Sequence, residues 1–210
     1  NAGDERSRPQ AWAKNIIAVG GIRHQNTLTK NDDTWNGGAS IGPAADGRIK
    51  PDLASYYDNI LTTTSGGGYT SGFGGTSGAT PIIAGHLGLF YEMWSDGIFG
   101  NSAPKATVFA NRPQNTTAKA VLINTASQWT FTGQAHDLTR VHQGWGHADL
   151  QTMYDLRDRM LVIDETDVLT ETASTDYIVS VDGTGPLKVT MVYRDWRSEE
   201  HTSELQSRSA

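Results

Sequence analysis

The sequence contains no cysteine, which excludes disulfide bonds, thiol catalysis and zinc sites built on thiolates. It also has no run approaching the roughly 20 apolar residues that a membrane-spanning helix needs. Acidic residues outnumber basic ones, so the formal net charge is −6, and no basic cluster stands before the C-terminal tail. This balance argues against nucleic acid as the main partner. What remains is a globular chain whose 210 residues suit one large domain or one and a half ordinary ones.

The two ends of the sequence carry their own expectations. The chain begins at Asn1 without methionine or an apolar leader, so we expect it to be part of a larger protein, and a signal peptide is neither indicated nor excluded. Residues 197–207 read RSEEHTSELQS, which resembles the in-frame translation of a sequencing-library adapter; the alternative is an ordinary polar tail. On the adapter interpretation the natural sequence stops near Trp196, and residues 197–210 are an artefact outside the fold.

Short β-prone runs dominate the first third of the chain. Residues 15–22, NIIAVGGI, form an apolar run closed by glycines, which predicts a buried strand of a parallel sheet. Residues 48–54, RIKPDLA, predict a strand-like approach to a proline turn, and residues 59–64, NILTTT, predict another β segment. The glycine-rich stretch 65–75 is expected to form no regular structure.

Helical periodicity follows in two places. From Thr80 onward apolar residues recur at helical spacing, with Pro81 in the first turn and an end near residues 95–97. A second helix is predicted over residues 116–127, with Asn115 or Thr116 as its cap. These helices and strands together predict an α/β fold.

The pattern changes again near residue 158. Residues 160–165, 176–183 and 186–193 alternate between apolar and polar side chains like strands. We therefore expect an α/β part over residues 1–157, followed by an incomplete antiparallel β module over residues 158–196.

Ser77 stands at the start of the first predicted helix, in the stretch GTSGATPIIAGHLG at 75–88. A serine there can be a helix cap. It can also be a nucleophile, because a helix N-terminus offers free N–H groups and positive partial charge to a developing oxyanion. The neighbours Gly75, Gly78 and Ala79 are small enough to admit a substrate carbonyl. Ala79 also stands where the lipase-type Gly-x-Ser-x-Gly elbow needs glycine, which argues against that fold.

Three segments, in this order along the chain, resemble the subtilisin-like serine proteases, or subtilases. NIIAVGG at 15–21 resembles the family's Val-Ile-Ala-Val-Gly-Ala, and KPDLA at 50–54 resembles Lys-Pro-Asp-Ile-Ala. GTSGATPIIAG at 75–85 matches Gly-Thr-Ser-x-Ala-x-Pro-x-x-Ala-Gly at every fixed position. The resemblance covers about residues 1–155 and implies a subtilisin-like parallel sheet flanked by helices. The β-rich remainder resembles the start of a jelly-roll or P-type module.

This resemblance implies a serine endopeptidase with Ser77 as the nucleophile that forms an acyl-enzyme. The family's second oxyanion donor, the asparagine of an Asn-x-Gly segment, falls on Asn1. A rival alignment places Asp4 there, where a carboxylate would repel the oxyanion. The resemblance also implies a protein or peptide substrate and a secreted or cell-envelope location. Calcium is implied by the resemblance alone, and no dense carboxylate loop fixes a site for it.

The family's catalytic aspartate and histidine precede the Asn-x-Gly segment, so we expect neither in this chain and predict negligible activity for it alone. His24 is expected in an exposed loop and His86 on the packed side of the helix. A loose group, His136, His142 and His147 with Asp137 and Asp149, leaves a metal site open, although no ligand spacing supports one.

The segment KPDLASYY departs from the family, whose members continue Ala-Ala-Pro-Gly where this chain has residues 55–58, SYYD. Asp52 is expected to be structural. The altered segment, together with the option of Asp4 in the oxyanion hole, motivates an alternative function: a degenerate, non-catalytic binding module on a subtilase scaffold. An esterase is a third reading.

Overall fold

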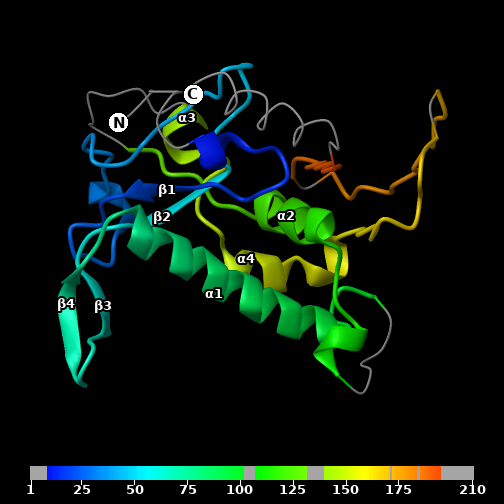
Figure 1. Cartoon of the computed structure of the whole chain (residues 1–210). Helices are drawn as coiled ribbons and strands as arrows, with labels where there is room; N and C mark the ends of the chain where they lie inside the picture. Colours follow the sequence, from blue (N-terminus) through cyan, green and yellow to red (C-terminus); the bar gives the residue numbers. More distant parts are fainter. Residues whose placement is uncertain (1–8, 102–106, 132–139, 171, 184, 195–210) are drawn as a thin grey trace, which may run out of the picture.

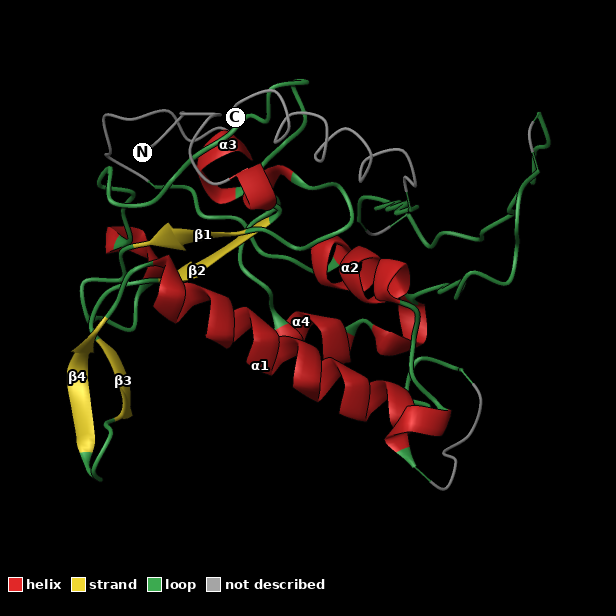
Figure 2. Ribbon diagram, in the orientation of Figure 1, coloured by secondary structure: helices red, strands yellow, loops and turns green. Residues whose placement is uncertain are grey.

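The fold is given by a computed structural model, which describes residues 9–101, 107–131, 140–170, 172–183 and 185–194. Helices and strands fill the first three quarters of the chain, and Figure 2 shows how they are distributed. The elements are η1 Pro9–Trp12, β1 Val19–Ile22, η2 Lys30–Asp32, β2 Leu53–Tyr56, β3 Ile60–Thr63, β4 Tyr69–Phe73, α1 Thr76–Ser95, η3 Val108–Ala110, α2 Asn115–Asn124, α3 Arg140–Gln143, α4 Leu150–Asp155 and η4 Arg157–Arg159.

A small parallel sheet forms the centre of the molecule. β1 and β2 pair in parallel, with Val19 opposite Leu53 and Ile22 opposite Tyr56. The long helix α1 packs against one face of both strands, and the short α3 lies on the other side of β1 (Figure 1). Most residues of the two strands are buried, as the apolar run at 15–22 predicts for β1. The α/β fold class is confirmed.

Alternate residues of β2 feed two separate cores, since successive side chains of a strand point to opposite faces. Leu53 belongs to the larger core, which also contains Ile83 and Phe90 of α1 and Leu122 of α2. Its neighbour Ala54 belongs to a smaller cluster on the other face, formed with Ile22, Trp129 and Phe131. Both Leu53 and Ala54 are fully buried. Strand β2 is therefore shared by the two cores.

Helix α1 begins earlier than the sequence pattern predicts. Its first residue is Thr76, so Pro81 lies inside the helix and not in its first turn. The missing N–H of Pro81 leaves the carbonyl of Ser77 without its usual helical donor. The buried positions Ala79, Ile83, Phe90 and Trp94 follow the helical period and hold the helix on the sheet.

The prediction that residues 65–75 lack regular structure is wrong in part. Residues 69–73 form β4, which pairs antiparallel with β3 and projects from the body as a hairpin near the start of α1 (Figure 1). The glycines are used in the turn, where Gly66, Gly67 and Gly68 all have φ above 90°. Only glycine adopts such angles readily, so the turn absorbs the glycines and leaves a strand after it.

The second predicted helix exists as α2 but is capped differently. It runs from Asn115 to Asn124, and its N-cap is Gln114, whose side chain makes no capping bond. The Oδ1 atom of Asn115 accepts a hydrogen bond from the N–H of Thr116 at 3.0 Å. Asn115 therefore lies inside the helix and accepts from one N–H group of its first turn. Neither Asn115 nor Thr116 is the N-cap.

The three stretches expected to be strands after residue 158 form none in the part of the chain that the structure describes. Residues 160–170, 172–183 and 185–194 run as extended chain, much of it away from the α/β body (Figure 1). Most of their apolar side chains, such as Ile178 and Val189, are exposed, whereas Met160 and Val162 pack partly buried against the larger core. Strands need a partner sheet on which to bury one face, and these residues have none. Within the described residues, no helix is both long and apolar enough to cross a membrane.

Candidate active site

Ser77 is the second residue of α1, and its hydroxyl has no hydrogen-bond partner among the described residues. The N-cap of the helix is Gly75, and no side chain caps it. Ser77 is an exposed residue. The alternative that Ser77 caps the helix therefore finds no support in this geometry, since a capping serine accepts from the helical N–H two or three residues later.

The first turn of α1 leaves an N–H group free beside this hydroxyl. The N–H groups of Gly78 and Ala79 both turn to the carbonyl of Gly75, at 2.8 and 3.4 Å. No described residue accepts from the N–H of Ser77. Because α1 is 20 residues long, the free N–H also stands at the positive end of a full helix dipole. Donor and hydroxyl belong to one residue, and a free backbone N–H beside a hydroxyl is able to stabilise an oxyanion formed there.

Glycines shape the approach to Ser77. Gly75 has φ 78° and ψ 172°, a conformation that side chains disfavour. A Cβ on Gly74 would lie 2.7 Å from the carbonyl oxygen of Tyr57, so the chain passes against the loop after β2. A Cβ on Gly78 would lie 3.2 Å from Ile60 of the hairpin. The turn is thus held between β2 and the β3–β4 hairpin.

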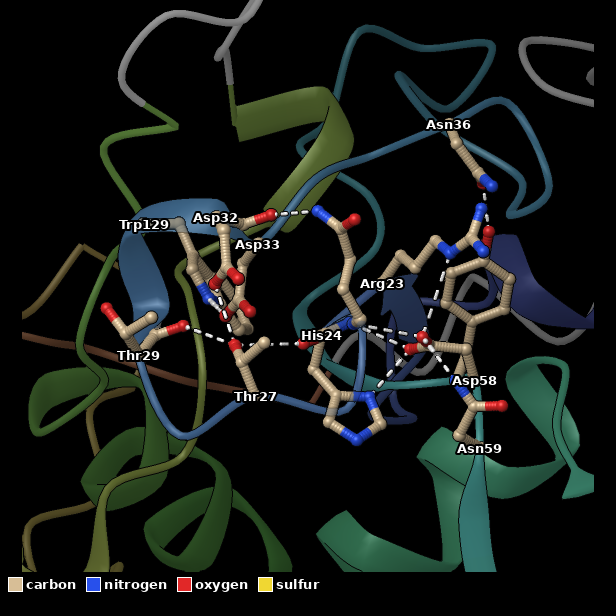
Figure 3. A network of polar contacts seen from close by, with 12 residues as sticks. Arg23, His24, Thr27, Thr29, Asp32, Asp33, Asn36, Asp58, Asn59 and Trp129 are labelled. Carbon is tan, nitrogen blue, oxygen red and sulfur yellow. Dashed lines mark hydrogen bonds and ion pairs between the residues drawn. The ribbon is translucent and has the colours of Figure 1, made fainter. Parts of the chain in front are cut away.

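The histidines of the described residues are engaged elsewhere. His24 is not exposed as expected: its side chain is 15% accessible, and its Nδ1 lies 2.7 Å from Oδ1 of Asp58 (Figure 3). His86 places its Nδ1 2.7 Å from the carbonyl oxygen of Ile82, within its own helix. None of these contacts includes Ser77, so the described residues show no base beside the hydroxyl.

His147 is partly buried among other aromatic rings. Its ring lies between those of Tyr56, His86 and Trp129, with centroids 5.2, 5.6 and 5.5 Å away. Burial, aided by the nearby His86, lowers the pKa of His147 to about 4. Its Nε2 atom is buried without a hydrogen-bond partner. The ring is therefore neutral at pH 7 and packs as an aromatic side chain.

The metal site that the sequence leaves as an alternative gains no support from the described residues. No group of three or more histidine, cysteine or acidic residues in the described ranges is placed to hold a metal ion. His142 is buried and its ring meets that of Trp35 edge-on at 4.7 Å. His136 and Asp137 lie outside the described residues. Asp149 serves as the N-cap of α4 and accepts from the N–H of Thr152 at 2.9 Å.

Asn1 and Asp4, the two candidates for the second oxyanion donor, also lie outside the described residues. Their assignment stays a prediction.

Asp52 is structural, as expected. Its Oδ2 lies 2.7 Å from Nζ of Lys50 and its Oδ1 lies 2.7 Å from Nζ of Lys119. Oδ2 also accepts a 2.7 Å hydrogen bond from the N–H of Ala18. Burial is the main cause of a lowered pKa at Lys50, which the charge of Asp52 opposes. The KPD segment thus ties β2 to α2 and to the residues before β1.

The contacts of Asp58 are not indicated by the sequence pattern. Its carboxylate accepts from the N–H of His24 at 2.7 Å and from the N–H of Gln25 at 3.0 Å, and it lies 3.7 Å from Nε of Arg23 (Figure 3). These bonds outweigh the cost of partial burial, so the pKa of Asp58 lies below its usual value. The departure from the family pattern in this segment was the signal that could have found it.

Comparison with known proteins decides the family. The model of the subtilase family, Peptidase_S8, matches residues 1–146, well over half of the chain. The chain belongs to the subtilase family. The match includes both strands of the parallel sheet, Ser77 and all of α1, so the first-turn geometry described above is that of a subtilase.

Individual relatives of this subtilase are serine proteases. Serine protease AprX of Bacillus subtilis is 31% identical over 97 residues, which cover 40% of this chain and 22% of that protein. Serine protease/ABC transporter B family protein tagA of Dictyostelium discoideum is 26% identical over 182 residues, 75% of this chain and 10% of that protein. The structure of the Clostridium perfringens CspB protease aligns with a TM-score of 0.50 at 26% identity, over 70% of this chain and 27% of that one. The chain thus spans between a tenth and about a quarter of the length of these relatives.

Proposed function

We propose that this subtilase chain carries the nucleophile of a serine endopeptidase and that Ser77 is that nucleophile. One observation carries the proposal: Ser77 is exposed, and neither its hydroxyl nor its N–H has a partner among the described residues, at the positive end of a 20-residue helix. A serine that served the fold would use its hydroxyl to cap the helix.

The proposed reaction is acyl transfer. The Oγ atom of Ser77 forms a bond to the scissile carbonyl carbon as a base takes its proton, and the Ser77 N–H stabilises the oxyanion. The C–N bond then breaks and the amine leaves with that proton. Water attacks the acyl-enzyme, which releases the acid and restores the hydroxyl. Asn1 is the proposed second oxyanion donor, and Asp4 is its rival.

The general base is proposed to come from outside the described residues, because His24, His86 and His147 are all engaged away from Ser77. The order of the triad in the family, Asp then His then Ser, supports this. On this proposal the 210 residues alone have negligible peptidase activity. A protein or peptide substrate and a secreted or cell-envelope location follow from the family and are proposed on that ground.

A fluorophosphonate probe tests the assignment of Ser77 on the 210-residue chain. Oxyanion donors retain about 10³–10⁴-fold rate enhancement when triad members are removed, so we expect slow labelling that mass spectrometry places on Ser77. Ser77→Ala should abolish it, and Ser71→Ala, a control at an exposed serine of β4, should not. Equal labelling of several serines would contradict the proposal, and rapid stoichiometric labelling of Ser77 would contradict the absence of a base.

The alternative, a degenerate binding module, rests on the altered segment at residues 55–58. It predicts no labelling of Ser77 even when the chain is joined to an N-terminal segment that supplies an aspartate and a histidine. Labelling that accelerates on such joining would support the peptidase.

A further inference from the structure

The altered segment at residues 55–58 is built around a carboxylate. Asp58 follows the end of β2 and accepts hydrogen bonds from two successive N–H groups after β1, those of His24 and Gln25, at 2.7 and 3.0 Å. The ring of His24 adds a third contact to the same carboxylate, 2.7 Å from its Nδ1. Two of these contacts come from backbone, so Asp58 holds the course of the chain after β1 and not a side chain alone (Figure 3).

The residue before Asp58 supports the turn that carries Ser77. The carbonyl oxygen of Tyr57 accepts a 2.6 Å hydrogen bond from the N–H of Gly75, the N-cap of α1. The N–H of Tyr57 in turn donates to the carbonyl of Ile22 at 3.1 Å. One residue, Tyr57, therefore connects the end of β1, the Asp58 loop and the residue two positions before Ser77.

Gly74 makes this contact tight. A Cβ there would lie 2.7 Å from the Tyr57 oxygen and 3.7 Å from the Cα of Asp58. The Ser77 turn therefore lies directly against the Asp58 loop, and a shift of that loop by a fraction of an ångström changes the Gly75 contact. Positioning errors of about 1 Å can reduce catalysis on the order of 10²-fold.

We propose that Asp58 is a positioning residue for Ser77: by tying the loop after β2 to residues 24 and 25, it fixes the Tyr57 carbonyl that holds Gly75 and the first turn of α1. Asp58 touches no reacting atom in this arrangement. The proposal gives the altered segment a role within a working subtilase, and its catalytic meaning rests on the proposed role of Ser77.

Amide hydrogen exchange in the 210-residue chain tests the positioning directly. Asp58→Ala removes every acceptor, and Asp58→Asn keeps the shape with one acceptor oxygen in place of two. We expect the Gly75 N–H to exchange at least 10-fold faster in Asp58→Ala and less so in Asp58→Asn. The N–H of Leu122, buried in the larger core, should change less than 2-fold. Asp46→Asn, at an exposed Asp–Arg pair, is the matched control and should change neither.

The outcomes separate positioning from general stability. Unchanged Gly75 exchange in Asp58→Ala overturns the proposal, and so does a parallel acceleration of Gly75 and Leu122 or a failure of both variants to fold. Labelling of Ser77 by the fluorophosphonate probe gives a separate readout, which Asp58→Asn should slow and Asp46→Asn should not. If wild type is not labelled but Gly75 responds to Asp58, the positioning stands and the assigned role of Ser77 fails.

Discussion

Strand β2 has an aspartate beyond each end, and the two do different work. Asp52 precedes the strand and meets two lysine ammonium groups, Lys50 and Lys119, each at 2.7 Å. Asp58 follows the strand and accepts mainly from uncharged backbone N–H groups. The first joins distant elements through buried charge, whereas the second shapes a loop beside Ser77.

The difference follows from burial and from the sides of the sheet. The side chain of Asp52 is 8% accessible and its lysine partners 5% and 12%, so none of the three charges is well solvated. Removing one partner of such a set leaves a buried charge without compensation. Asp58 lies at the carboxyl ends of β1 and β2, where ligand sites of open α/β sheets gather. The buried ion pairs thus lie at one end of the strand, and the proposed positioning contact lies at the other.

Asp52→Ala should have the largest effect. It leaves Lys50 and Lys119 buried near each other without an anion and removes the acceptor for the N–H of Ala18. We expect the free energy of unfolding to fall by about 3–5 kcal/mol, measured by urea denaturation followed by circular dichroism.

Asp46→Ala is the control for Asp52→Ala. Asp46 pairs with Arg48 at 2.7 Å, and its side chain is 49% accessible. An exposed pair of this kind contributes about 0–1 kcal/mol. Equal losses from the two variants would contradict the contrast between the buried and exposed aspartates.

Acid should lower the stability of the fold through His147, whose ring lies against Tyr56 at the C-terminal end of β2. Its pKa is lowered to about 4 in the fold, against about 6.5 in an unfolded chain. The unfolded state therefore binds more protons between pH 4 and 6.5, and stability is lost as the pH falls through that window. The difference amounts to roughly 3 kcal/mol. Unfolding free energies measured by urea at pH 7, 6, 5 and 4 give the slope.

His147→Phe should flatten this slope, since it keeps an aromatic ring against Tyr56 and Trp129 and removes the titrating group. The buried Nε2 atom also has no hydrogen bond to lose. A variant that retains the full slope between pH 6.5 and 4 would assign the acid sensitivity to another group.

The sequence predicts the elements whose signal is local. The apolar run at 15–22, the helical spacing after Thr80 and the serine motif identify β1, α1 and the place of Ser77 near the start of that helix. β4 was missed because its residues are mixed with turn glycines, and periodicity alone does not show where the turn ends. The sequence places the start of α1 too late, because proline is typical of the first turn of a helix. In the structure, five residues of the helix precede Pro81.

Contacts between distant residues could not be predicted from one sequence. The carboxylate of Asp58 meets residues 23–25, more than 30 positions earlier, and Lys119 meets Asp52 across 67 positions. The alternating runs after residue 158 show that a clear local pattern is also not sufficient to predict a strand. Their pattern is typical of strands, yet a strand also needs a partner, which the described residues do not supply.

The smallest effect on stability should come from Ser77, the proposed nucleophile. Ser77→Ala removes a hydroxyl with no described hydrogen bond, so we expect the unfolding free energy to change by less than about 0.5 kcal/mol. Asp149→Ala is the matched control, because Asp149 does cap a helix, with a 2.9 Å bond to the N–H of Thr152. That loss should cost about 1 kcal/mol. If urea denaturation shows Ser77→Ala to be as costly as Asp149→Ala, Ser77 stabilises the helix and the argument from its unpartnered hydroxyl fails; if only Asp149→Ala is costly, the hydroxyl of Ser77 does not cap the helix, as the proposed role of a nucleophile requires.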